Sequence, residues 1–153
     1  MPAPAAAAVP HPEASGPGIP NINPVTGLST DYLNHFSEAL MALEMVRDVP
    51  ECIDDLRAWR PKTYAEHFAG SRLSQRGEII RMYEAAPRPL REALDALADL
   101  LNARLAEARD AAVHGRPAGH AAAALRPLIA QLADLINGSM ARSQAAIDAM
   151  FPK

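Results

Sequence analysis

The sequence predicts an all-α protein: a small bundle of four to five helices that includes a long C-terminal antiparallel hairpin and follows a disordered N-terminal arm. Two observations carry this prediction. The 153 residues include 32 alanines but only seven aromatic residues, and such a composition favours close helix packing over pleated sheets. Apolar residues also recur at intervals of three and four along most of the chain, which is the period of a helix with one buried face.

Residues 1–24 form the predicted arm, which is rich in proline and alanine. They contain seven of the fourteen prolines and a single formal charge, Glu13, and they show neither a helical nor a strand period. Segments of this composition bury too little apolar surface to order themselves and favour polyproline-like conformations. We expect the arm to be either an inert tail or a docking segment that orders on a partner, and residues 25–153 to form one domain.

The first part of the domain, residues 25–86, is expected to hold short helices. The first of these should run from about 30 to 47 and bury an apolar stripe. The stripe consists of Leu33, Phe36, Leu40 and Leu43. Met41 and Met45 lie on a different face at 100° per residue, so this helix is apolar on two sides. Such a helix is either enclosed by several neighbours or shared with a partner.

Three further helix starts follow within this part. Asp48, followed by Pro50 and Glu51, predicts the start of a helix that should end before Pro61. Thr63 and Glu66 have the spacing of a capping box, and a helix from about 71 to 85 follows Gly70. The apolar residues of the helix before Pro61 are Cys52, Ile53, Leu56 and Trp59.

Residues 87–153 are predicted to form an alanine- and leucine-rich helical hairpin. A turn at 114–119 separates its two helices, and Pro127 is expected in the first turn of the return helix or at a kink there. The outgoing stripe consists of Leu90, Leu94, Leu97, Leu101, Leu105, Ala108 and Ala112. The return stripe consists of Leu125, Leu128, Ile129, Leu132, Ile136, Met140, Ile147 and Met150.

Composition also limits where the protein acts and what it binds. The net charge of −3 and the pI near 5.9 give no general attraction to nucleic acid. No window approaches the roughly 18 apolar residues that cross a bilayer. Residues 1–10 have no positive charge at their start and prolines interrupt their short apolar run, so we do not expect them to be a secretory signal. The single cysteine, Cys52, cannot form an internal disulfide, and we expect it to be a buried structural thiol. We therefore expect a cytoplasmic protein, and its use of alanine, arginine and proline is typical of high-GC bacterial genomes.

One chemical alternative comes from two copies of the pattern Tyr-x-x-His-Phe, at 32–36 and 64–68. Together with nearby carboxylates they offer a metal or cofactor site, and with it enzyme activity, inside a helical bundle. The candidate residues are His35, Glu38, Glu66 and His67. The helical projection turns the histidine and glutamate of the first copy away from the core stripe, and the Glu-x-x-His spacing of carboxylate-bridged sites is missing. We therefore prefer a structural role for them and expect no cofactor.

A basic and aromatic segment is the other candidate for function. Residues 57–91 hold eight basic against three acidic side chains, and the densest part surrounds the only tryptophan. Arginine and tryptophan are the residues most enriched at the energetic centres of protein interfaces. We therefore predict a non-enzymatic interaction or regulatory module that binds another protein, or a second copy of itself. The predicted contact residues are Arg57, Trp59, Arg60, Lys62, Met41 and Met45.

Overall fold

The computed structural model describes residues 21–138, and within that range it consists of six α-helices and no β-strand. The predicted fold class is confirmed for this part of the chain. The helices number six rather than four to five, because the capping box at Thr63 starts a separate helix of only six residues. The helices are α3 (Tyr32–Met45), α4 (Cys52–Ala58), α5 (Tyr64–Ala69), α6 (Arg76–Ala85), α7 (Arg88–Val113) and α8 (Gly119–Ile136).

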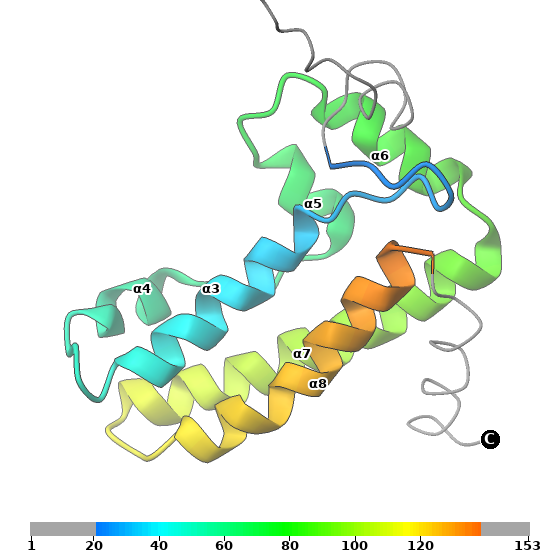
Figure 1. The fold of residues 1–153 in the computed structure, drawn as a ribbon. Coiled ribbons are helices and arrows are strands. Elements are labelled where there is room, and N and C mark those ends of the chain that lie inside the picture. The colour runs from blue at the N-terminus through cyan, green and yellow to red at the C-terminus, as the bar shows by residue number, and fades with distance from the viewer. Residues whose placement is uncertain (1–20, 139–153) are drawn as a thin grey trace, which may run out of the picture.

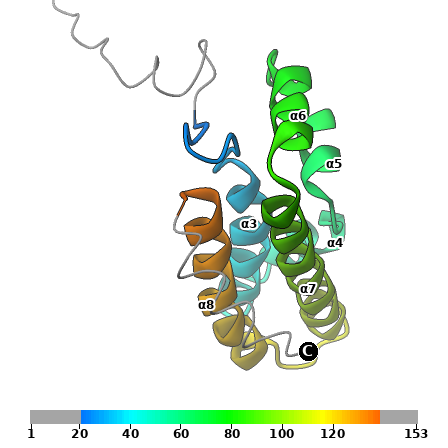
Figure 2. The same cartoon turned by 90° about the vertical axis from the view of Figure 1, so that its right-hand side faces the viewer.

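Helices α7 and α8 run antiparallel to each other, and α3 lies along both of them (Figure 1). The short helix α4 packs on α3 and α7, while α5 packs on α3 and α6. The view turned by 90° shows α8, α3 and α7 side by side, with α4, α5 and α6 on the α7 side (Figure 2). Helices α3 and α4 therefore cover one side of the α7–α8 pair, whereas α5 and α6 extend beyond one end of it (Figures 1 and 2).

The core lies between α3, α7 and α8 and is built mainly from leucine and alanine. Six of the seven residues of the outgoing stripe are buried, and the last one, Ala112, is partly buried. On α8, Leu125, Leu132 and Ile136 are buried. Leu128 and Ile129 of the return stripe are partly buried against this core, and Met140 and the later residues of the stripe lie outside the described residues. Pro127 lies well inside α8 rather than in its first turn, because the helix already begins at Gly119.

The segment before α3 packs on the bundle, which corrects the predicted end of the arm. Residues 21–24 were assigned to the arm, yet Ile22 is buried and pairs with Ser29 in an isolated β-bridge. A tight turn at Gly27 (φ +73°) closes this loop. The Thr26 hydroxyl donates a hydrogen bond to the carbonyl of Ile136 at 2.6 Å, so the loop is tied to the end of α8. Residues 1–20 of the predicted arm lie outside the described residues.

Two other expectations about the helices have clear outcomes. The Thr63 and Glu66 capping box is present, with each side chain bonded to the backbone of the other residue. The next helix begins at Arg76 rather than near Ser71, because the Ser71 hydroxyl forms local turns with the backbone of Phe68 and Leu73. Over residues 21–138, no helix has the length and apolar character needed to cross a membrane.

Candidate functional site: a groove beside α3 and α4

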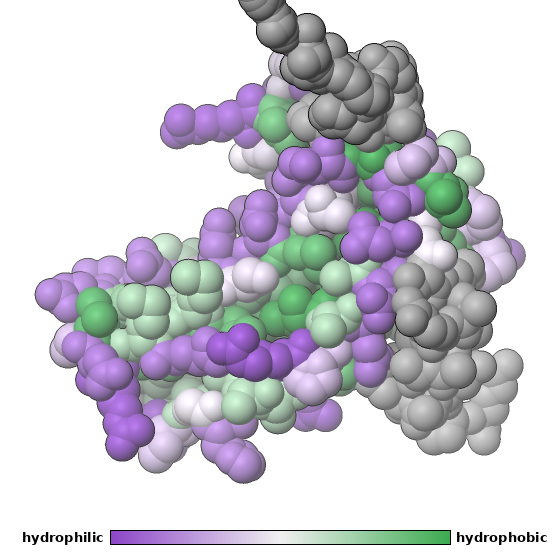
Figure 3. All heavy atoms as spheres, in the orientation of Figure 1, coloured by the Kyte–Doolittle hydropathy of each residue, from purple (hydrophilic) through white to green (hydrophobic). Residues whose placement is uncertain are grey.

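A groove of about 730 Å³ runs between α3, α4 and the segment that joins α4 to α5. It brings together two parts of the sequence that were singled out separately, the second apolar face of α3 and the segment around Trp59. Apolar surface is visible over α3 and α4 in the space-filling view, bordered by hydrophilic side chains (Figure 3). The lining residues are His35, Glu38, Ala39, Met41, Ala42, Met45, Cys52, Asp55, Ala58, Trp59, Arg60, Lys62 and His67.

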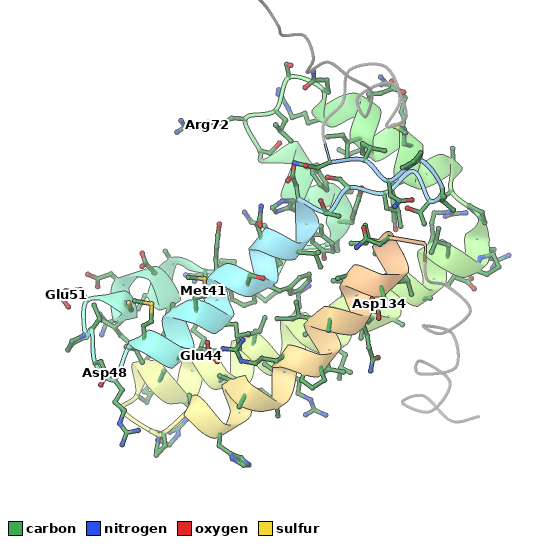
Figure 4. All side chains as sticks on the ribbon, viewed as in Figure 1. Met41, Glu44, Asp48, Glu51, Arg72 and Asp134 are labelled. Carbon is green, nitrogen blue, oxygen red and sulfur yellow. The ribbon has the colours of Figure 1, made fainter. Side chains whose placement is uncertain are left out.

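The apolar wall of the groove on α3 comes from its two exposed methionines. Met41 is 57% exposed and Met45 is 44% exposed, although both side chains are large and apolar. Met41 lies on the side of α3 that faces α4, whereas Glu44 lies on the side toward α8 (Figure 4) and pairs there with Arg126. Helix α3 is thus buried on one face against the hairpin and left apolar and open on another.

Trp59 also lines the groove, directly after the last residue of α4. The backbone leaves the helix here in an extended conformation (ψ 139°). The indole Nε1 donates a hydrogen bond to the carbonyl of His35 at 2.9 Å, and the two rings stack with centroids 4.9 Å apart. Trp59 is therefore half-buried against the core and still lines the groove.

Two arginines hold the backbone of this segment in place. The carbonyl of Trp59 accepts hydrogen bonds from Arg60 and from Arg109 of α7, both at 2.8 Å. Arg60 also donates to the carbonyl of Arg57. The two ends of this segment keep helical hydrogen bonds, from the Trp59 amide to the Asp55 carbonyl and from the His67 amide to the Thr63 carbonyl. The Trp59 carbonyl lies past the end of α4, and the arginine side chains supply its donors.

A polar network behind the groove connects His35, Asn102 and Lys62. The Asn102 side chain pairs with the Lys62 backbone in both directions: its Nδ2 donates to the carbonyl at 2.9 Å, and its Oδ1 accepts from the amide N–H at 3.3 Å. This pairing fixes the orientation of the amide, so Oδ1 is the atom that faces His35 Nε2 at 2.8 Å. Since Oδ1 can only accept, Nε2 carries the proton, and Nδ1 is the unprotonated nitrogen of the neutral ring.

Burial sets the protonation state of the two histidines in this region. Burial lowers the pKa of His35 to about 4, against its usual 6.5, and the positive charge of Lys62 and the neighbouring His67 act in the same direction. Burial also lowers the pKa of His67, with Lys62 assisting, although Asp31 and Glu38 oppose the shift. At neutral pH the inner end of the groove therefore presents a neutral His35.

The four residues of the metal alternative are not gathered into one cluster. Among residues 21–138, no three histidine, cysteine or acidic side chains lie close enough together to hold a metal ion. His35, Glu38 and His67 line the groove, but Glu66 caps α5 through the amide of Thr63. The expectation that His35 points away from the core was wrong: it is only 5% exposed and bonded to Asn102.

The predicted partner-binding residues divide into two groups in space. Five of the six line the groove, and the sixth, Arg57, pairs with Asp54 on the exposed side of α4. The rest of the basic segment does not extend the groove. Arg81 and Arg88 form exposed ion pairs with Glu78 and Glu92 of their own helices. Comparison with protein-family models, with curated proteins and with solved structures finds no match to this chain.

Proposed function

We propose that this chain is a non-enzymatic interaction or regulatory module of a bacterial cytoplasm, and that it binds another protein through the groove beside α3 and α4. The observation that carries the proposal is that Met41, Met45 and Trp59 all line one groove. Exposed apolar surface of this kind, rimmed by polar residues, is characteristic of sites where proteins associate.

The chemistry of the lining supports a protein as the occupant. Methionine side chains are flexible and polarisable, so they adapt to the shape of an incoming apolar side chain. Trp59 offers a large contact area that is already held by its bond to His35, so little entropy is lost when it is covered. Charges of both signs surround this apolar centre: the acidic side chains are Glu38 and Asp55, and the basic ones are Arg60 and Lys62. Such charges would select the partner and its orientation.

The test compares the proteins captured by three forms of the full chain. In the groove variant, Met41→Glu and Met45→Lys replace the apolar wall with a helical i,i+4 ion pair, which keeps the net charge and supports the helix. The matched control, Val25→Glu with Val49→Lys, makes the same chemical change at two exposed apolar residues that do not line the groove. Circular dichroism and thermal melting show whether each variant keeps its fold.

If the groove is the binding surface, the captured proteins should crosslink to the wild type and to the control variant but not to the groove variant. Their dissociation constants, measured with purified partner, should rise at least tenfold in the groove variant and stay within about twofold in the control, because covering two methionines contributes on the order of 2 kcal/mol. Capture of the same proteins by all three forms would show that the groove is not the binding surface.

A further inference from the structure

The N-terminal arm leaves the described fold beside one end of the groove. The carbonyl of Asn21 accepts a hydrogen bond from the amide of Thr30 at 3.0 Å, and the Asn21 side chain donates to the carboxylate of Asp31 at 2.9 Å. Tyr32, the residue after Asp31, lies beside His67, with the two ring centroids 5.6 Å apart. His67 lines the groove. Residues 1–20 therefore connect to the fold at the His67 end of this surface.

The arm is long enough to cover the groove several times over. Along α3 the lining residues extend from His35 to Met45, which is roughly 15 Å at 1.5 Å per residue. A polyproline II segment rises about 3.1 Å per residue, so five residues cover that length. The 20 residues of the arm have a reach of about 60 Å by the same measure. Distance therefore does not prevent the arm from lying in the groove of its own chain.

The composition of the arm fits the chemistry of the groove. Residues 1–20 contain six prolines, and Glu13 is their only formal charge. Proline-rich segments bind grooves lined by aromatic rings, because the extended conformation is already set and little entropy is lost. Here Trp59 and the methionines offer the apolar contacts, and the exposed side chains of Arg60 and Lys62 offer positive charge for Glu13.

We propose that residues 1–20 dock into the groove of their own chain and compete there with the external partner. This inference rests on the proposed function of the groove, and it adds a regulation: partner binding must displace the arm. Because the arm is tethered, its effective concentration at the groove is on the order of millimolar, so even a weak contact is substantially populated. The arm thus keeps the methionines and Trp59 covered until a partner of higher affinity arrives.

A paramagnetic label on the arm tests this without any partner. The full chain carries Cys52→Ser and Ala8→Cys with a nitroxide on the new cysteine, and amide signals of ¹⁵N-labelled protein are compared before and after reduction of the label. Docking should remove at least half the signal intensity of groove amides such as Met41, Met45 and Ala58. Amides of α6, which lies beside the same N-terminal loop where Gly27 meets Met82, should lose much less.

The control replaces the six arm prolines with glycine at the same chain length, which keeps the tether but removes the preformed extended conformation. In this variant, the loss of signal intensity at the groove amides should be at least twofold smaller. Equal broadening of groove and α6 amides, or no change in the glycine variant, would overturn the proposal. A mixture of spin-labelled ¹⁴N chains with unlabelled ¹⁵N chains detects docking of the arm into a second copy. If the groove amides in this mixture broaden as much as those of the singly labelled chain, the proposal of docking within one chain is also overturned. Neither failure touches partner binding by the groove, which the methionine variants test separately.

Discussion

His35 of α3 and Asn102 of α7 are joined by a hydrogen bond of 2.8 Å between Nε2 and Oδ1. Both residues are buried, and Asn102 is also the side chain that binds the backbone of Lys62. One polar contact therefore links the helix that forms one wall of the groove, the segment that forms the other, and the hairpin beneath them. The contact acts together with the hydrogen bonds that Arg60, Arg109 and Tyr32 donate to the same segment. Side chains therefore hold the middle of this segment in place beside the groove.

We predict that Asn102→Ala destabilises the fold by roughly 2–4 kcal/mol, because it leaves two donors, His35 Nε2–H and the Lys62 amide N–H, without an acceptor. The Lys62 carbonyl keeps the hydroxyl of Tyr32 as a donor at 2.7 Å. Urea unfolding measures the change. The matched control is Asn137→Ala, since Asn137 is an exposed asparagine directly after the last residue of α8, and it should cost less than about 1 kcal/mol. Similar costs at the two sites would contradict the role given to Asn102.

We predict that stability falls as the pH drops from about 6.5 toward 4. In the unfolded chain His35 takes up a proton near pH 6.5, whereas in the fold burial lowers its pKa to about 4. Between these values the unfolded state binds more protons, so acid favours unfolding, by roughly 2–3 kcal/mol across the window. Urea unfolding at several pH values, compared with His35→Gln, isolates the effect. A pH dependence in the variant as steep as in the wild type would assign the loss to other groups.

The parts of the fold that depend on period and composition could be predicted from the sequence. The stripe from Leu90 to Ala108 is buried as expected, because a helix of 26 residues repeats the same signal many times. The apolar methionine face of α3 could also be predicted, since Met41 and Met45 are four residues apart and lie on a different side of the helix from Phe36 and Leu40. Both features depend only on the spacing of residues within one helix, so they can be predicted without knowing which helices lie beside it.

The polar network behind the groove could not be predicted, because it depends on the path of the segment between α4 and α5. That segment has no period, so the sequence does not say which distant side chains satisfy its backbone. The predicted stripe of this helix contains only aliphatic residues and Phe36, and it therefore leaves His35 outside the core. One signal was present: Asn102 lies four residues after Ala98 and three before Leu105, which are both buried. A polar residue in such a row predicts a buried hydrogen bond.

The core of the α7–α8 pair gives a direct prediction. Leu101→Ala and Leu132→Ala should each cost about 2–4 kcal/mol in the free energy of unfolding, because both side chains are fully buried and the cavity adds to the lost transfer energy. Leu100→Ala, at a half-buried neighbour, should cost clearly less. Urea unfolding compares the three. Costs below roughly 1 kcal/mol at both buried sites would mean that the stripe is not the centre of the core.

Trp59→Ala should lower stability by about 2–3 kcal/mol, because it removes the stacking on His35 and leaves the His35 carbonyl without the indole donor. Trp59→Phe keeps the ring contact and loses only the donor, so it should cost about 1 kcal/mol. Thermal and urea unfolding of the two variants separate the contributions. If neither variant changes stability, Trp59 serves the groove alone and does not anchor the core.

The charges beside Trp59 should act on partner binding rather than on the fold. Arg57 forms only an exposed ion pair with Asp54 at 3.4 Å, a type of contact that contributes little to stability. Arg60 donates to the Trp59 carbonyl, but Arg109 donates to the same carbonyl, which therefore keeps a donor without Arg60. Arg57→Glu with Arg60→Glu should thus leave the free energy of unfolding within about 1 kcal/mol of the wild type. It should nevertheless weaken the affinity for the captured partner about tenfold at low salt, and less as salt screens the charges.

The matched control reverses the same charges elsewhere, at the exposed residues Arg72 and Arg76. Arg72 points away from the helices (Figure 4), and neither residue lines the groove. Arg72→Glu with Arg76→Glu makes an identical change in net charge, so any loss of affinity that it shares with the first pair is a long-range effect of total charge. If the charges at Arg57 and Arg60 contact the partner, reversing them should weaken the affinity several times more than reversing Arg72 and Arg76. Equal affinities for the wild type and both double variants at low salt would show that the charges around Trp59 form a solvated face with no part in binding.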